Sequence, residues 1–258
     1  MKALISIFIL VFWMSAQAQL EWIYQTGGDF SGAYEQDGAT AITTDAAGNS
    51  YITGYFDGNS DFDFGNQDFI LNSSGGTNSF VVKLDPAGQL VWVKTFGGSS
   101  NKGNSIKLDA QQNIYVGGSF TGTVDFDPNS NSQLESSNGS LDAYVVKLDT
   151  NGDFVWVKTL GGDTFDTCSG LTIDIYSNVY FTGSFTNTVD FDLGEGAYPI
   201  TSAGAKDAYV VKLDKDGNWK WSNTYGSTGI DNGYSIGIDN DQNIYIAGEF
   251  SETVDFDS

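Results

Sequence analysis

The chain has 258 residues, and its 33 acidic and 11 basic side chains give a formal net charge of −22. All the basic residues are lysines, arginine and histidine are absent, and Cys168 is the single cysteine. This composition excludes nucleic-acid binding through a cationic surface, catalytic triads that need an imidazole, zinc sites built on histidine or several thiolates, and guanidinium clamps for phosphate.

Residues 1–18 have the layout of a secretory signal peptide. Lys2 gives a positive start, residues 3–14 form an apolar run, and Ala16-Gln17-Ala18 is a small-x-small cleavage site. A transmembrane helix needs about 20 apolar residues, so an uncleaved membrane anchor is the less favoured alternative. We expect cleavage after Ala18, a secreted or cell-surface location, and no membrane insertion of the mature chain.

Residues 19–258 consist of one unit that repeats about every 65 residues, which is the signature of a repeat architecture. Two of the recurring positions carry Tyr51, Tyr115, Tyr180 and Tyr245, and Trp92, Trp156 and Trp221. The units are approximately 27–98, 99–162, 163–226 and a partial 227–258. About 3.7 units therefore follow the signal peptide.

Each unit reads as four short strands, which we take from the second unit as 105–108, 113–120, 143–148 and 154–159. These segments are rich in Val, Ile, Tyr, Phe and Trp and are bounded by Gly, Asn and Asp, as β-strands are. A longer polar segment, 121–141, separates the second strand from the third. No segment after Ala18 keeps a helical period. The sequence therefore predicts an all-β protein, a β-propeller of four-stranded antiparallel blades.

The number of blades depends on the two ends of the chain. Residues 20–26 align with the fourth strand of a unit, whereas the last unit stops after its second strand. Closure as a four-bladed propeller would need residues 20–26 to lie beside residues 243–250, and would leave a thin, exposed last blade. We expect instead an incomplete propeller that continues beyond Ser258 in a longer secreted protein.

Three recurring motifs carry a family resemblance. They stand in this chain as residues 109–120 (Asp-x-x-x-Asn-x-Tyr-x-x-Gly-x-Phe), 143–149 (Ala-Tyr-Val-Val-Lys-Leu-Asp) and 155–162 (Val-Trp-Val-Lys-Thr-x-Gly-Gly). They resemble the SBBP-type β-propeller repeat of bacterial secreted proteins, and the Val-Asp-Phe-Asp insert is similar to versions in exported proteins of gliding-type bacteria. The resemblance covers residues 20–258 and implies a fold without implying an activity.

An Asp-x-Asp pair recurs in the polar segment of every unit. Its members are Asp61 and Asp63, Asp125 and Asp127, Asp190 and Asp192, and Asp255 and Asp257. Residues i and i+2 of an extended strand share a face, and Ca²⁺ prefers oxygen ligands, so these pairs are candidate calcium ligands. The alternative is a solvated acidic loop anchored by the phenylalanine between the two aspartates.

Other recurring residues have structural explanations that we prefer. The tryptophans would fill gaps between blades, the alternative being a row that stacks on carbohydrate. Lys83, Lys147 and Lys212 would pack their stems and point their heads to a nearby aspartate or to solvent. Cys168 is expected to be a small, partly buried residue without reactivity.

Function follows weakly from these features because the propeller fold hosts unrelated activities. We expect a non-catalytic exported module for recognition or adhesion, with an unidentified protein or glycan ligand and no nucleic acid. A structural spacer or surface-layer component is the first alternative. A glycoside hydrolase is the second, disfavoured because catalytic sites usually break a repeat whereas these units are nearly uniform.

Overall fold

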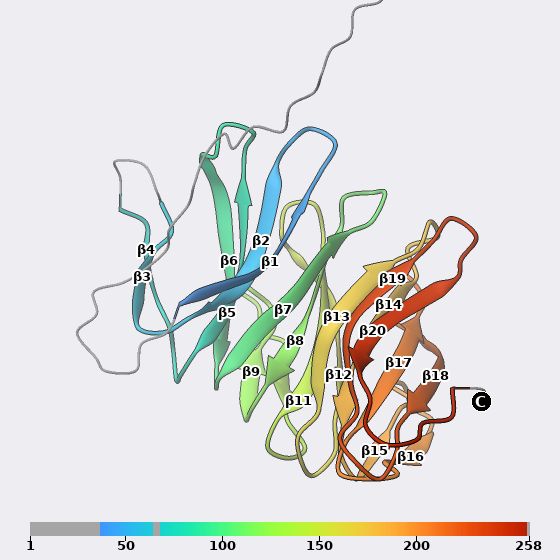
Figure 1. Cartoon of the computed structure of the whole chain (residues 1–258). Helices are drawn as coiled ribbons and strands as arrows, with labels where there is room; N and C mark the ends of the chain where they lie inside the picture. Colours follow the sequence, from blue (N-terminus) through green and yellow to red (C-terminus); the bar gives the residue numbers. More distant parts are fainter. Residues whose placement is uncertain (1–36, 64–67, 257–258) are drawn as a thin grey trace, which may run out of the picture.

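The computed structural model describes residues 37–63 and 68–256 (Figure 1). Within these ranges the regular elements are all β-strands, and no helix there is long and apolar enough to cross a membrane. The predicted signal peptide and the predicted strand at 20–26 lie outside the described residues. The all-β prediction is confirmed for the part of the chain that the structure describes.

Three four-stranded antiparallel blades follow one another and correspond to the predicted blades. The second and third are separate four-stranded sheets, and the first is the four-stranded part of a six-stranded sheet. Blade 1 consists of β1 (Gly38–Thr44), β2 (Ser50–Phe56), β5 (Asn78–Leu84) and β6 (Leu90–Gly98). Blade 2 consists of β7 (Asn101–Leu108), β8 (Ile114–Phe120), β11 (Asp142–Leu148) and β12 (Phe154–Leu160). Blade 3 consists of β13 (Thr167–Ile173), β14 (Val179–Phe185), β17 (Asp207–Leu213) and β18 (Trp219–Tyr225). The hairpin of β19 (Asn232–Ile238) and β20 (Ile244–Glu249) begins a fourth unit.

The polar segment between the second and third strands is more ordered than the sequence predicts. In each blade it folds into a short insert hairpin. These hairpins are β3 (Asn59–Asp61) with β4 (Ile70–Asn72), β9 (Thr123–Asp125) with β10 (Leu134–Ser136), and β15 (Thr188–Asp190) with β16 (Pro199–Thr201). β9 also pairs with β6, the outermost strand of blade 1, so one insert joins two neighbouring blades.

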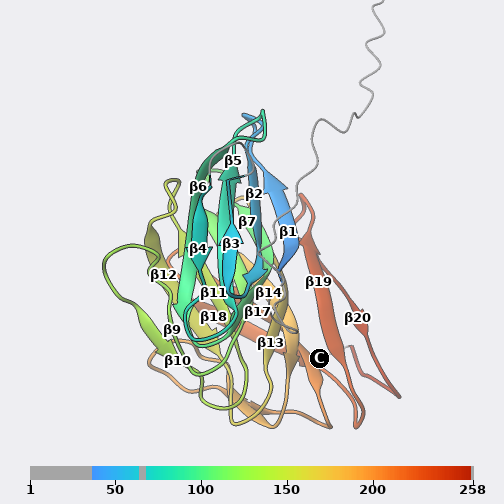
Figure 2. The same ribbon diagram turned by 90° about the vertical axis from the view of Figure 1, so that its left-hand side faces the viewer.

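The first strands of the units, β1, β7, β13 and β19, lie along the inner side of a fan of blades (Figures 1 and 2). Each of these strands has a β-bulge, which turns the bulged side chain out of the regular alternation. Two bulged side chains then bond to the next inner strand. Thr40 Oγ1 donates to Gly103 O at 2.6 Å, and Asn104 Nδ2 donates to Cys168 O at 2.9 Å.

The recurring tyrosines pack between consecutive blades. Tyr51, Tyr115 and Tyr180 are buried, and each makes an edge contact with the tryptophan of its own unit at about 6 Å between ring centroids. Tyr115 also donates its hydroxyl to Asp109 Oδ2 at 3.0 Å. The equivalent Tyr245 is 60% exposed, because no further blade covers β20 within the described residues. The burial of this position therefore comes from blade-to-blade contact.

At each junction between blades a glycine of one blade faces a larger residue of the other, and the blade that carries the glycine changes from junction to junction. A Cβ built at Gly103 would overlap Thr53 of blade 1, and one built at Gly233 would overlap Thr182 of blade 3. At the middle junction the sizes are reversed, because a Cβ at Gly117 would lie 2.7 Å from Cys168 Sγ. At each junction, therefore, one residue of the pair is a glycine, and the side chain of the other residue fills the space beside it.

The turn between the third and fourth strands of blade 3 sits in a socket on blade 2. Lys147 Nζ donates to Lys215 O at 2.9 Å, and Trp156 Nε1 donates to the same oxygen at 3.3 Å. The ammonium lies 5.0 Å from the centroid of the Tyr115 ring. Gly217, at φ +82°, lies so close to the Trp156 ring that a Cβ would be 3.1 Å from it. Trp156 therefore packs between blades, and Lys147 reaches a backbone oxygen rather than an aspartate.

Replacing Lys147 with methionine should lower the free energy of unfolding by about 1–3 kcal/mol, because the apolar stem is kept while a buried hydrogen bond from a charged donor is lost. Chemical denaturation measures the change. Lys107, which is exposed on β7, supplies the control, and Lys107→Met should stay within about 0.5 kcal/mol of the parent. Equal effects of the two replacements would contradict the socket.

Cys168 is fully buried, deeper than the sequence predicts, and burial raises the pKa of its thiol to about 12. A thiol reagent needs the thiolate and access to it. We expect no reaction of the folded protein with an aromatic disulfide reagent at pH 8, and one equivalent of reaction after unfolding in guanidinium. Prompt labelling of the folded protein would show that the junction between blades 2 and 3 opens.

Candidate functional site

The first aspartate of each Asp-x-Asp pair closes the loop of an insert hairpin. Asp125 Oδ1 accepts hydrogen bonds from the backbone N–H of Asp127 at 3.1 Å and of Gln133 at 2.8 Å. Asp61 and Asp190 make the same two backbone contacts in their own units. The phenylalanine between the aspartates is fully buried in the first three units, at Phe62, Phe126 and Phe191. These pairs therefore shape the insert hairpins.

Calcium binding by these pairs stays a prediction. Ca²⁺ takes six to eight oxygen ligands. Across residues 37–63 and 68–256, no three acidic or thiol side chains are grouped so that they could hold a metal ion. Asp257 lies outside the described residues. A shift of the melting temperature with millimolar CaCl₂ is the measurement that decides it.

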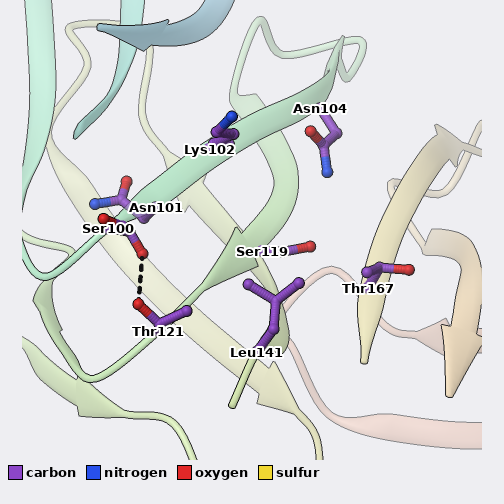
Figure 3. Close-up of a pocket in the computed structure, with 8 residues that line it drawn as sticks. All are labelled: Ser100, Asn101, Lys102, Asn104, Ser119, Thr121, Leu141 and Thr167. Atoms are coloured by element: carbon purple, nitrogen blue, oxygen red, sulfur yellow. Dashed lines mark hydrogen bonds between the residues drawn. The ribbon is translucent and has the colours of Figure 1, made fainter. Parts of the chain in front are cut away.

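A cavity of about 330 Å³ lies where the inner strands of blades 2 and 3 begin (Figure 3). It is partly open to solvent, and most of its exposed wall is formed by carbon atoms. Its lining residues come from the start of β7, the end of β8, the start of β13 and the loop before β11: Ser100, Asn101, Lys102, Asn104, Ser119, Thr121, Leu141 and Thr167. This size lies within the range of small-molecule and side-chain pockets.

One hydroxyl at this cavity has no hydrogen-bond partner. Ser119 is 6% exposed, its Oγ is buried, and neither a side chain nor the backbone bonds to it. In Figure 3 the hydroxyl points from β8 toward Thr167, with Asn104 and Leu141 on either side. A buried polar group without a partner costs about 1–3 kcal/mol, so such groups often mark a position that a ligand or water completes.

Lys102 stands at the edge of the cavity. Its side chain is exposed, and its ammonium lies 4.0 Å from the centroid of the Tyr55 ring of blade 1. Cation–π contact of this kind holds a flexible lysine in place. The exposed surface of the cavity is therefore mostly carbon, although seven of its eight lining residues are polar or charged, and it contains one unsatisfied hydroxyl. Lys102 is a lining residue whose ammonium lies over the Tyr55 ring of blade 1, in a chain that is otherwise strongly acidic.

Sequence reasoning did not find this cavity, although a signal was present. The residues that join blades repeat closely from unit to unit, whereas the residues around the cavity differ. The position of Ser119 carries Tyr55, Ser119, Ser184 and Glu249 in the four units, and that of Asn104 carries Thr40, Asn104, Ser169 and Tyr234. When the residue type changes between otherwise uniform units, packing between blades does not determine the residue at that position.

Comparison with known proteins gives distant relatives. No protein-family model matches the chain. It is 24% identical over 199 residues to an uncharacterized WD repeat-containing protein of Acanthamoeba polyphaga mimivirus, a match that covers 67% of this chain and 14% of that protein. It is 23% identical over 145 residues to the regulatory protein FlaEY of Caulobacter vibrioides, covering 56% of this chain and 15% of that protein. This chain thus spans a small part of the length of each relative, and WD repeats form propeller blades.

Proposed function

We propose that this chain is a non-catalytic propeller module of an exported protein, and that it binds a protein partner at the end of its inner strands where the cavity opens. The SBBP-type repeat and a role in adhesion belong to the same proposal. The similarity to a WD repeat-containing protein supports a protein-interaction module. Neither relative is named as an enzyme.

The observation that carries the proposal is the contrast between junctions and cavity. The tyrosine, tryptophan and lysine that hold blades together recur in unit after unit, so the scaffold is rigid and regular. The residues around the cavity vary, as binding residues do when a rigid scaffold presents them. A spacer would need no such variation on one end of its inner strands.

A displayed peptide library panned on the full chain tests the proposal. Binders are then measured on Lys102→Glu, which changes the charge at the cavity, and on Val155→Glu, which places the same charge on the exposed outer strand of the same blade. We expect binders to lose about tenfold in affinity, or about 1.4 kcal/mol, on the first variant and to be unchanged on the second. Failure to enrich binders, or binders insensitive to Lys102→Glu, would reject the proposal.

A further inference from the structure

We propose that the cavity between blades 2 and 3 receives a tyrosine side chain of the partner protein. This inference rests on the proposed function and names the chemistry of the partner at the same site. It follows from a comparison of equivalent positions in units 1 and 2.

In unit 1 the equivalent space is filled by the chain's own tyrosine. Tyr55 is the last but one residue of β2 and stands where Ser119 stands in β8. Its ring lies against Gly38 of β1, where a Cβ would be 3.0 Å from the ring. The ammonium of Lys102, from the inner strand of the next blade, covers the ring at 4.0 Å.

In unit 2 the corresponding ring is missing from the chain. Ser119 takes the place of Tyr55, and Thr167 takes the place of Lys102 as the residue that the next blade contributes. The cavity of about 330 Å³ lies at this place and has Ser119 and Thr167 in its wall. A serine in place of a tyrosine therefore leaves open in unit 2 a space that Tyr55 fills in unit 1.

The wall suits a ring that carries one polar group. Most of it is apolar, and the Ser119 hydroxyl is buried without a partner. A phenol hydroxyl can both donate and accept, and it is neutral at pH 7 because its pKa is about 10. A phenylalanine would leave the Ser119 hydroxyl unsatisfied. A sugar ring would stack on an aromatic side chain, and none of the eight lining residues is aromatic.

The third unit shows why only one such site is expected among the described residues. Ser184 occupies the position of Ser119 in blade 3, but its hydroxyl is 3.1 Å from Thr167 Oγ1 and is satisfied by it. Tyr55 fills the position in blade 1. Ser119 is thus the only serine of this repeat position, within residues 37–63 and 68–256, whose buried hydroxyl has no partner.

The test measures binding of N-acetyl-tyrosinamide to the full chain by NMR titration, with shifts followed at residues 102, 104 and 167. We expect one site in the parent protein and none in Ser119→Tyr, where the new ring would occupy the cavity beside Lys102, the residue that stands where unit 1 has Gly38. Tyr55→Ser should open a second site of the same kind. Ser119→Ala should weaken binding about fivefold and leave the weaker binding of N-acetyl-phenylalaninamide unchanged.

The parent protein and Tyr55→Ser keep the inference testable if Ser119→Tyr does not fold. No binding by the parent protein, or equal binding by the folded Ser119→Tyr variant, would overturn the inference. An unchanged number of sites in Tyr55→Ser would do the same. If library peptides depend on Lys102 but bind without a tyrosine, the tyrosine inference fails while the proposed function stands. If peptides bind independently of Lys102, the proposed function itself fails.

Discussion

Replacing Gly117 with threonine should lower the free energy of unfolding by about 1–3 kcal/mol, and adding Cys168→Gly should restore most of that loss. A Cβ at position 117 would lie 2.7 Å from Cys168 Sγ and 2.9 Å from Leu171 Cδ2. The second replacement removes the contact with Cys168, and the flexible end of the Leu171 side chain must shift in both variants. The double replacement recreates the Thr–Gly pairs of the other two junctions. There Thr53 and Thr182 donate their hydroxyls to backbone oxygens at 2.8 Å and 2.6 Å, so a threonine in this slot is fully satisfied.

Urea denaturation of the parent protein, the two single variants and the double variant measures the interaction energy between positions 117 and 168. Cys168→Gly alone removes a buried side chain and should also destabilise, by about 1–2 kcal/mol. Residues in direct contact couple, so the double variant should be more stable than the sum of the single effects predicts. Additive losses would show that the two positions do not share one space.

Asp142→Asn and Asp207→Asn should each stabilise the protein at pH 7, by about 1–3 kcal/mol, which is the cost of a buried polar group without a partner. Asp142 is 1% exposed and Asp207 is 4% exposed, and the Oδ1 atom of each has no hydrogen-bond partner. Their Oδ2 atoms accept from the backbone N–H of Asn138 and Ala203, both at 2.9 Å. The Oδ1 atom of each carboxylate is therefore buried without a hydrogen-bond partner, although the backbone N–H groups of Gly139 and Gly204 also lower the respective pKa values.

Blade 1 shows what this position requires. Its equivalent residue is Asn78, and the orientation that satisfies the amide lets Oδ1 accept from Ser74 N at 3.2 Å while Nδ2 donates to Ser74 O and Gly76 O at 3.3 Å each. The lone oxygens of Asp142 and Asp207 take the place of that donor. In blade 1 a donor occupies that position and faces carbonyl oxygens, so by equivalence we expect a protonated carboxyl to suit the position better than an ionised one.

The pH dependence has a definite sign. Burial, and then the nearby charges of Asp166 and Asp231 respectively, raise the pKa values of Asp142 and Asp207. Burial likewise raises the pKa of Asp166, and this effect is partly offset by hydrogen bonds from the backbone N–H groups of Gly162 and Thr186 and by the charge of Lys206. A group with a raised folded pKa binds its proton more tightly in the folded state. Its contribution to stability is complete below the unfolded value of about 3.9 and is lost as pH rises through the folded pKa.

Denaturation between pH 4 and pH 8 tests this assignment. The parent protein should lose stability as pH rises across this interval, and the two asparagine variants together should flatten the profile. Asp153→Asn is the control, since this carboxyl is exposed and pairs with Lys94 at the surface at 3.3 Å. If the asparagine variants were less stable than the parent at pH 7, the carboxylates would be favourable where they stand.

The blade architecture could be predicted because it depends on residues that repeat. Tyr115, Trp156 and Lys147 recur at fixed spacing, since every junction needs the same socket. The insert hairpins were missed because strands of three residues, such as β9, carry no alternating pattern of their own and depend on loop closure by Asp125. The recurring aspartates suggested a calcium site, whereas the cavity lies at Ser119, a position where the residue type changes from unit to unit. A search for what recurs finds the scaffold and overlooks such exceptions.

The pairing of β9 with β6 also bears on how this protein avoids self-association. Outermost strands of propeller blades present unpaired backbone groups, and such edges are templates for aggregation. Gly97 and Gly98 at the end of β6 pair with Asp125 and Val124, so the edge of blade 1 is capped there by a neighbour's insert. The insert hairpin of blade 2 therefore covers part of the exposed edge of β6. Its deletion should expose that edge to pairing with another chain, as in fibril growth.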